Sequence, residues 1–252
     1  MKNRIARIAL YIVSLTPLFA AHAEDPKSNA ALVEETVKLA RSYLGESDTL
    51  DAVTSIQYQG VLVYGNGDSG TLASVYKKPL YQKFTSVIND FKEVSALNRT
   101  EAWRKVESVS KPGAWSLEFY EVDDIHHMQA AVREALAFLG TPRSRKGHIE
   151  YLGTESVEGH DTRILVYYHT DEIWFRRYID IETGKVISTI NDRGVIFEEH
   201  GEKMISGIRF PEKMVTRFLT EQGEQTIELN YTSITVNEEI DDTLFGVPIM
   251  AD

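Results

Sequence analysis

The chain has 252 residues, 42% of them hydrophobic and 26% charged, which is the composition of a globular protein with room for a large core. It contains no cysteine, so disulfides, thiolate metal sites and cysteine nucleophiles are excluded. The formal net charge of −11 disfavours binding to nucleic acid or to anionic lipid headgroups, and it favours a partner with a basic patch.

Residues 1–23 have the pattern of a cleaved secretory signal peptide. The first seven residues carry three cations, Lys2, Arg4 and Arg7. Residues 8–20 (IALYIVSLTPLFA) are apolar, and residues 21–23 (AHA) place small side chains where a signal peptidase cuts. The apolar run is too short to span the ~30 Å hydrocarbon core of a bilayer. We therefore expect a mature chain of residues 24–252 in the periplasm or outside the cell, where losing three cations changes the charge from −11 to about −14.

The first element after this leader is predicted to be a helix over residues 28–45. Val33, Val37 and Ala40 recur on one face at helical spacing, and Gly45 follows the last apolar position. Because one face is apolar, we expect this helix to dock on the rest of the protein.

From residue 55 to residue 106 the hydrophobic period changes to two, which predicts antiparallel strands joined by short turns. In the first strand Ile56, Tyr58, Leu62 and Tyr64 share one face. Strand follows strand without an intervening helix. This order excludes an array of βαβ units.

A second helix is predicted over residues 122–139, where Ile125, Met128, Val132 and Leu136 form a stripe and Gly140 is expected to end it. A basic loop follows, with three cations: Arg143, Arg145 and Lys146. Two interpretations of this loop remain open. It is either a solvated connection or a contact point for an acidic partner.

Strands resume between residues 148 and 236, including a single strand predicted over residues 203–208, and complete a mainly β (α+β) protein. We predict one domain with about eleven antiparallel strands in a curled sheet and two covering helices. A sheet of this size curls, and its concave side must be covered or filled. Either the helices fill the interior, or they leave an apolar hollow for one lipid-like ligand. Periodicity does not distinguish the two, and it does not show which strand face points inward.

The strongest candidate for a metal site is the segment at residues 123–127 (DDIHH), and it fails on geometry. Adjacent residues of a helix point about 100° apart, so His126 and His127 cannot both reach one ion. A solvated helix start is the favoured interpretation. The sequence also lacks a G-x-S-x-G elbow, a P-loop and a dinucleotide fingerprint, so it supports neither catalysis nor a cofactor.

Five short segments, in order, resemble motifs of the LolA/LolB-like superfamily of outer-membrane lipoprotein-sorting proteins. They are residues 77–84 (KKPLYQKF), 98–103 (NRTEAW), 179–184 (IDIETG), 205–211 (ISGIRFP) and 236–248 (VNEEIDDTLFGVP). The segment at 98–103 departs from the family pattern, because Asn98 and Arg99 stand where the family has Asp-Gly. The second predicted helix is also longer than a short lid segment.

This resemblance implies a half-open barrel whose helices plug the mouth and whose cavity holds acyl chains. We therefore predict a periplasmic, non-enzymatic carrier or binder of lipid or lipoprotein acyl chains, without a cofactor or metal. The alternative is a periplasmic sensor or interaction module that binds a protein partner. The predicted cavity lining consists of aromatic and aliphatic strand residues, with two helix residues as a lid: Tyr58, Leu62, Phe84, Trp103, Trp115, Trp174, Met128 and Leu136.

Overall fold

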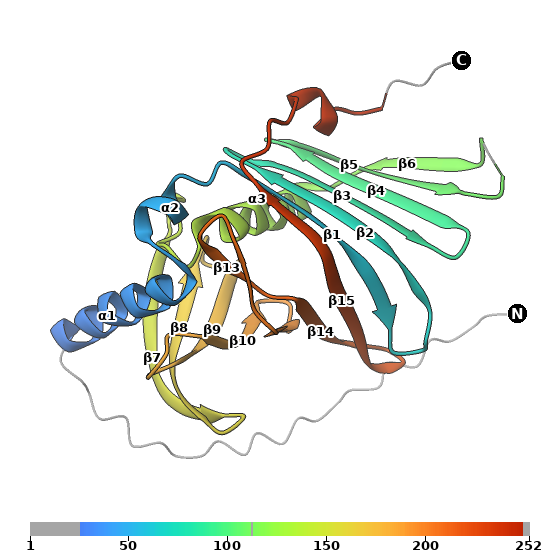
Figure 1. The fold of residues 1–252 in the computed structure, drawn as a ribbon. Coiled ribbons are helices and arrows are strands. Elements are labelled where there is room, and N and C mark those ends of the chain that lie inside the picture. Colours follow the sequence, from blue (N-terminus) through green and yellow to red (C-terminus); the bar gives the residue numbers. More distant parts are fainter. Residues whose placement is uncertain (1–25, 112, 249–252) are drawn as a thin grey trace, which may run out of the picture.

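The computed structural model describes residues 26–111 and 113–248, so the predicted signal peptide lies outside the described residues. Within them, 13 antiparallel strands form one open sheet, in the order β6-β5-β4-β3-β2-β1-β15-β14-β11-β10-β9-β8-β7. Two further strands, β12 and β13, form a separate hairpin. The chain passes from β6 at one edge to β7 at the other through helix α3, and the sheet bends around this helix (Figure 1).

The strands joined by turns or short connections have these bounds: β1 Ser55–Tyr64, β2 Ser69–Lys77, β3 Tyr81–Ile88, β4 Phe91–Asn98, β5 Glu101–Ser108 and β6 Trp115–Phe119. The second run comprises β7 His148–Val157, β8 His160–Tyr168, β9 Trp174–Asp180, β10 Val186–Asn191, β11 Ile196–His200, β12 Lys203–Ile205, β13 Ile208–Phe210, β14 Lys213–Thr220 and β15 Gly223–Val236. The mainly β prediction is confirmed, although the sheet has more strands than the eleven or so predicted.

Two corrections concern the strands. The five-residue strand β6 was missed, because it follows a loop containing Lys111 and Gly113 and is too short to show a clear period. The single strand predicted over residues 203–208 is instead a hairpin. Ser206 and Gly207 turn the chain there with positive φ angles of 51° and 79°.

Both predicted helices are confirmed, as α1 (Pro26–Leu44) and α3 (Val122–Ala137). The structure adds a short helix α2 (Ser47–Asp51) and a 3₁₀ helix η1 (Asp242–Phe245). No described helix combines the length and the hydropathy that a bilayer-spanning segment requires.

The end of α3 differs from the prediction. Gly140 was expected to end the helix, but the left-handed residues are Phe138 (φ 45°) and Leu139 (φ 63°). This conformation is unfavourable for residues with a Cβ, so tertiary contacts must offset its cost. Phe138 is buried, with its ring centroid 6.1 Å from that of Phe210. Arg41 of α1 also donates to the carbonyl oxygens of Ala137 and Phe138.

Three apolar clusters hold the described part of the chain together. The largest joins α3 to strands β1, β4, β5, β13 and β15, and its members include Ile56 and Leu97. The second joins α1 to β7, β8 and β9 through residues such as Ala40 and Leu165. The third lies beneath η1, where Phe245 is fully buried. The helices α1 and α3 therefore cover one face of the sheet, and η1 covers part of the other.

Candidate functional site: the inner face of the sheet

We call the side of the sheet against which α1 and α3 pack the inner face. Directly opposed residues of an antiparallel pair point to the same side, so the register carries this assignment from strand to strand. Ile56 is buried in the cluster with α3 and fixes the inner side of β1, which Tyr58 and Leu62 share. From Tyr58 the register leads through Ser74 on β2 to Phe84 on β3. These three predicted lining residues thus lie on one face.

One half of the inner face is filled beneath α3. Val132 and Leu136 of α3 are buried there, and Met128 packs against the same cluster. Tyr58 borders this region, with its ring centroid 5.2 Å from that of Tyr231. The interior beneath the helix is therefore packed by side chains.

The other half lies toward the turns that join β1 to β2, β3 to β4 and β14 to β15. Its apolar side chains join none of the three clusters. We call this set the inner apolar surface; its members are only partly buried: Phe84, Phe197, Met214, Phe218 and Leu229. Leu62 pairs with Leu229 in the same region and is 6% exposed. An apolar face thus remains accessible to solvent on the inner side of the sheet.

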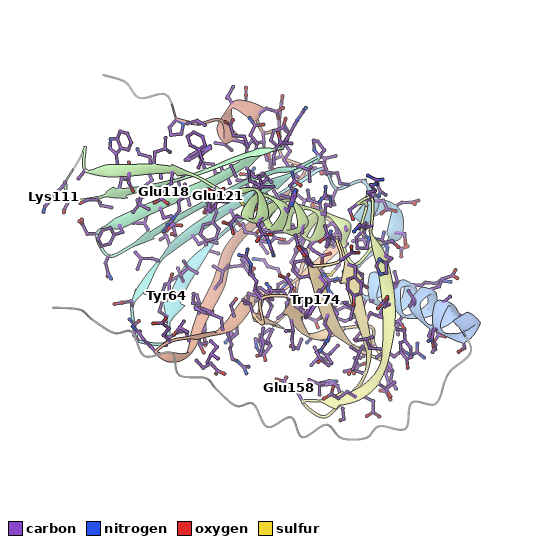
Figure 2. The ribbon with its side chains drawn as sticks, turned by 180° about the vertical axis from the view of Figure 1, so that it is seen from behind. Tyr64, Lys111, Glu118, Glu121, Glu158 and Trp174 are labelled. Atoms are coloured by element: carbon purple, nitrogen blue, oxygen red, sulfur yellow. The ribbon has the colours of Figure 1, made fainter. Side chains whose placement is uncertain are left out.

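The three tryptophans do not lie with the other predicted lining residues. Trp103 pairs with Ala96, one position away from the inner residue Leu97, so it points to the outer face. Trp115 follows it there, because the register from Trp103 places β6 residues 115, 117 and 119 on the same side. Trp174, labelled in Figure 2, is next to Phe175 on β9. Phe175 pairs with Tyr167, which packs against α1 on the inner face, so Trp174 points to the outer face. A period of two shows which residues of one strand share a face, but it does not show which face is the inner one.

Trp103 serves the packing of η1. Its Nε1–H donates to the carbonyl oxygen of Phe245 at 3.1 Å, and its side chain is 3% exposed. Replacing Trp103 with phenylalanine is expected to cost about 1–3 kcal/mol of stability, because the buried carbonyl loses its donor. Urea unfolding followed by circular dichroism measures this change. The matched control is Trp115→Phe on the same face, whose side chain is 42% exposed and which should change stability little; equal effects would contradict the assignment.

A polar cluster ties α3 to the opposite half of the sheet. The carboxylate of Glu134 on α3 accepts from His169, whose Nε2 lies 2.6 Å from Oε1, and from the guanidinium of Arg177 on β9. At the start of α3, His127 Nε2 lies 2.9 Å from Asp192 Oδ2, just beyond β10. Since the apolar side of α3 packs toward β4 and β5, the helix bridges the two halves of the bent sheet.

Burial controls the protonation of this cluster. It lowers the pKa of Arg177 to about 10, an effect that the Glu199 carboxylate opposes. Burial, followed by the charge of Arg133, lowers the pKa of His169 to about 4. His169 is therefore neutral at pH 7, with Nε2–H donating to Glu134, and its Nδ1 has no hydrogen-bond partner among the described residues.

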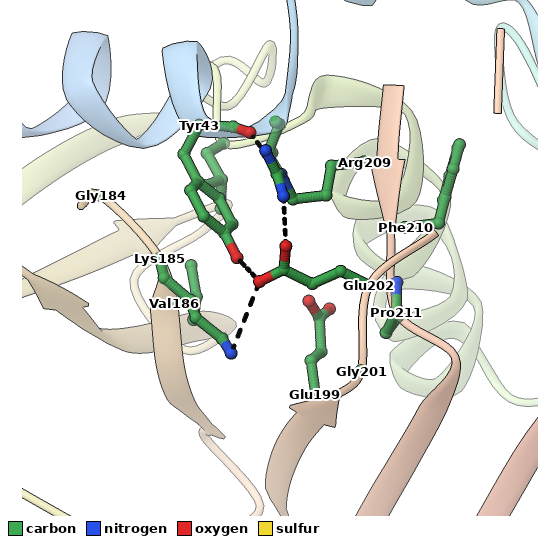
Figure 3. Close-up of a pocket in the computed structure, with 12 residues that line it drawn as sticks. Tyr43, Gly184, Lys185, Val186, Glu199, Gly201, Glu202, Arg209, Phe210 and Pro211 are labelled. Carbon is green, nitrogen blue, oxygen red and sulfur yellow. Dashed lines mark hydrogen bonds and ion pairs between the residues drawn. The ribbon is translucent and has the colours of Figure 1, made fainter. Parts of the chain in front are cut away.

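A small pocket lies beside this cluster, between α1, the β9–β10 turn and the β12–β13 hairpin (Figure 3). Glu202 organises it by accepting from Tyr43 and Arg209 and by pairing with Lys185 at 3.9 Å. Its volume of about 20 Å³ holds one water molecule and little more. Ligand pockets usually measure about 300–1,000 Å³, so this one cannot take an acyl chain.

Two further candidates from the sequence are the DDIHH segment at residues 123–127 and the basic loop with Arg143, Arg145 and Lys146. The described residues contain no group of three or more side chains placed to hold a metal ion. His127 contacts Asp192, and Asp124 pairs with Arg193 at 3.0 Å. In the basic loop, Lys146 pairs with Asp171. The exposed side chains of Arg143 and Arg145 have no ion-pair partner in the described part of the chain.

Sequence reasoning missed the polar cluster and four members of the inner apolar surface. Glu134 and Arg177 are 43 positions apart, so no local spacing links them. Leu229 alternates with the polar residues Glu228 and Asn230, which is a detectable signal for one strand face but does not show that this face is the inner one. The other three, Phe197, Met214 and Phe218, each have an apolar neighbour on the opposite face, so alternation gives no signal for them.

No protein-family model and no curated protein matches the chain. Several solved structures do. A LolA superfamily protein from Nitrosomonas europaea aligns with a TM-score of 0.57 and 11% identity, over 85% of this chain and 97% of that one. A DUF1329 family protein from Desulfovibrio piger gives 0.52 and 12%, over 85% and 97%. A domain from Vibrio parahaemolyticus, described as an outer membrane lipoprotein-sorting protein, gives 0.51 and 11%, over 84% and 97%. The resemblance to the LolA superfamily is thus confirmed at the level of the fold.

Proposed function

We propose that the protein is a non-enzymatic carrier or binder of lipid or lipoprotein acyl chains that acts in the periplasm after export. The observation that carries this proposal is the inner apolar surface, which stays partly exposed although it lies on the face that the helices cover. The description of the Vibrio parahaemolyticus domain as a lipoprotein-sorting protein supports the same role. We assign the acyl chain to the open half of the inner face, with α3 as the neighbouring lid.

Burial of the ligand is sufficient to drive binding. Each CH₂ group moved out of water contributes about 0.8 kcal/mol, so a long acyl chain needs no charged anchor. Tyr58, Leu62 and Phe84 form the β1–β3 side of the binding surface, and Met128 and Leu136 belong to the lid. Room beneath α3 would open only if the helix moved, because Leu136 and its neighbours fill that space.

The direct test is native mass spectrometry of the protein purified from periplasm, followed by organic extraction. Acyl species that leave with the protein in stoichiometric amount support the carrier. A ligand-free mass with a bound polypeptide contradicts it and favours the alternative, a sensor that binds a protein partner.

Introducing a carboxylate into the inner apolar surface by mutation should abolish retention of the acyl ligand. In Phe84→Asp and Phe218→Asp variants we expect the extracted acyl content per protein to fall more than tenfold, because a carboxylate beside the chain must be desolvated. Leu219→Asp is the matched control. Leu219 adjoins Phe218 but points to the outer face and is 82% exposed. Equal retention in folded Phe218→Asp and Leu219→Asp proteins would contradict the assignment.

A further inference from the structure

The free edge of the sheet at β6 concentrates exposed apolar side chains. Strand β6 pairs only with β5, so its other edge has no strand partner among the described residues. Three large apolar residues on β6 and the β5–β6 loop are between 42% and 59% exposed: Val109, Trp115 and Phe119. The inner apolar surface is separate from them, because Trp115 and Phe119 point to the outer face. The exposed Phe91 on β4 does not belong to this set, because it pairs with Ile88 and points to the inner face.

Lysines lie near Trp115 on the same outer face. The register aligns Lys92, Glu107 and Trp115 in one row across β4, β5 and β6. The next position on the outer face of β5, two residues before Glu107, is Lys105, whose Nζ lies 5.6 Å from the centroid of the Trp115 ring. Lys83 is close enough to Lys92 that, after burial, the charge of Lys92 lowers its pKa. A further lysine, Lys111, stands at the tip of the β5–β6 hairpin (Figure 2).

The exposed carboxylates of Glu101 and Glu118 lie toward the Phe119 end of β5 and β6. Around Trp115, in contrast, the local charge is opposite to that of the whole chain, whose net charge is −11, because four lysines stand there against two carboxylates, Asp90 and Glu107. Both carboxylates are engaged: Glu107 pairs with Lys92 and Lys105, and Asp90 accepts from Ser108 and from the backbone of Ser110. The lysines therefore leave a net positive patch around Trp115.

We propose that this edge, formed by the three exposed apolar residues and the four lysines, docks the protein on an anionic lipid bilayer. Tryptophan and phenylalanine side chains enter the headgroup boundary, and lysines extend their charge toward the phosphates. The acidic remainder of the protein repels an anionic bilayer only weakly in this orientation. Charges farther from the bilayer than the Debye length, about 10 Å at 0.1 M salt, are largely screened. The other possible occupant, a second copy of the chain paired along β6, does not require the lysines.

This inference goes beyond the proposed function and is independent of what the inner face binds. The test is flotation of the purified protein with vesicles of phosphatidylglycerol and phosphatidylcholine, compared with phosphatidylcholine alone. We expect binding to the anionic vesicles only, with roughly 1 kcal/mol per lysine, so that the triple variant K92Q/K105Q/K111Q binds roughly 100-fold more weakly. A second variant, W115S/F119S, should also lose binding while its urea unfolding midpoint shows that it is folded.

The control replaces exposed apolar residues elsewhere, as in M204S/L219S, and should float like the unmodified protein. Absence of flotation by the unmodified protein, or equal flotation of all variants, would overturn the proposal. So would self-association in sedimentation experiments that W115S/F119S abolishes without any vesicle binding, because the edge would then serve a second copy. Acyl extraction from the same variants reports on the inner face separately, so the two proposals fail independently.

Discussion

Replacement of Glu134 by alanine is expected to lower the free energy of unfolding by about 3–5 kcal/mol, the usual cost of removing one partner of a buried ion pair. Arg177 is 7% exposed and its Nη1 already lacks a partner among the described residues. Without Glu134, neither that guanidinium nor the buried His169 has its acceptor, and the polar tether from α3 to β9 is lost. Urea unfolding at pH 7, followed by circular dichroism, measures the change.

A matched control separates the loss of this pair from the loss of any carboxylate. Glu224 is exposed on β15, and its replacement by alanine should stay within about 0.5 kcal/mol. The double variant Glu134→Leu with Arg177→Met should recover much of the loss, because apolar residues of similar volume replace buried ion pairs at little cost. If E134A and E224A unfold at the same urea concentration, the buried pair does not stabilise α3.

The helices were predictable because each carries its own apolar stripe. On α1, Val33, Val37 and Ala40 pack against β7–β9, as their spacing requires. On α3, Val132 and Leu136 pack in the same way into the largest apolar cluster. The end of α3 was not predictable, since Phe138 adopts its left-handed conformation through contacts with Phe210 and Arg41 that lie far away in sequence.

The strands show a different limit. Alternation identified β1 and grouped Tyr58 with Leu62, yet the same alternation could not assign Trp103 or Trp174 to the outer face. The choice of face depends on where α1 and α3 pack, and α3 lies in the long connection from β6 to β7 at the two edges of the sheet. An aromatic residue on a strand is equally suited to either face, so residue type did not resolve the ambiguity.

The stability of the protein is expected to fall as the pH falls from about 7 to 5, and His169 is the reason. Its pKa is about 4 in the folded protein and 6.5 when unfolded. Between these values the unfolded chain binds the extra proton, so stability is fully present above pH 6.5 and is lost toward pH 4. With about 1.36 kcal/mol for each pKa unit, the loss at pH 5 is about 2 kcal/mol. Urea unfolding at the two pH values measures it.

The variant His169→Gln isolates this contribution, because glutamine keeps a donor for Glu134 and does not titrate. We expect its stability to change less than that of the unmodified protein over the same pH range. A charged His169 would place a second buried donor, Nδ1–H, where no acceptor exists among the described residues, and it would add a cation beside Arg133 and Arg177. Glu134 cannot compensate fully, since its carboxylate already neutralises Arg177. Parallel pH profiles for the two proteins would show that His169 keeps its ordinary pKa in the fold.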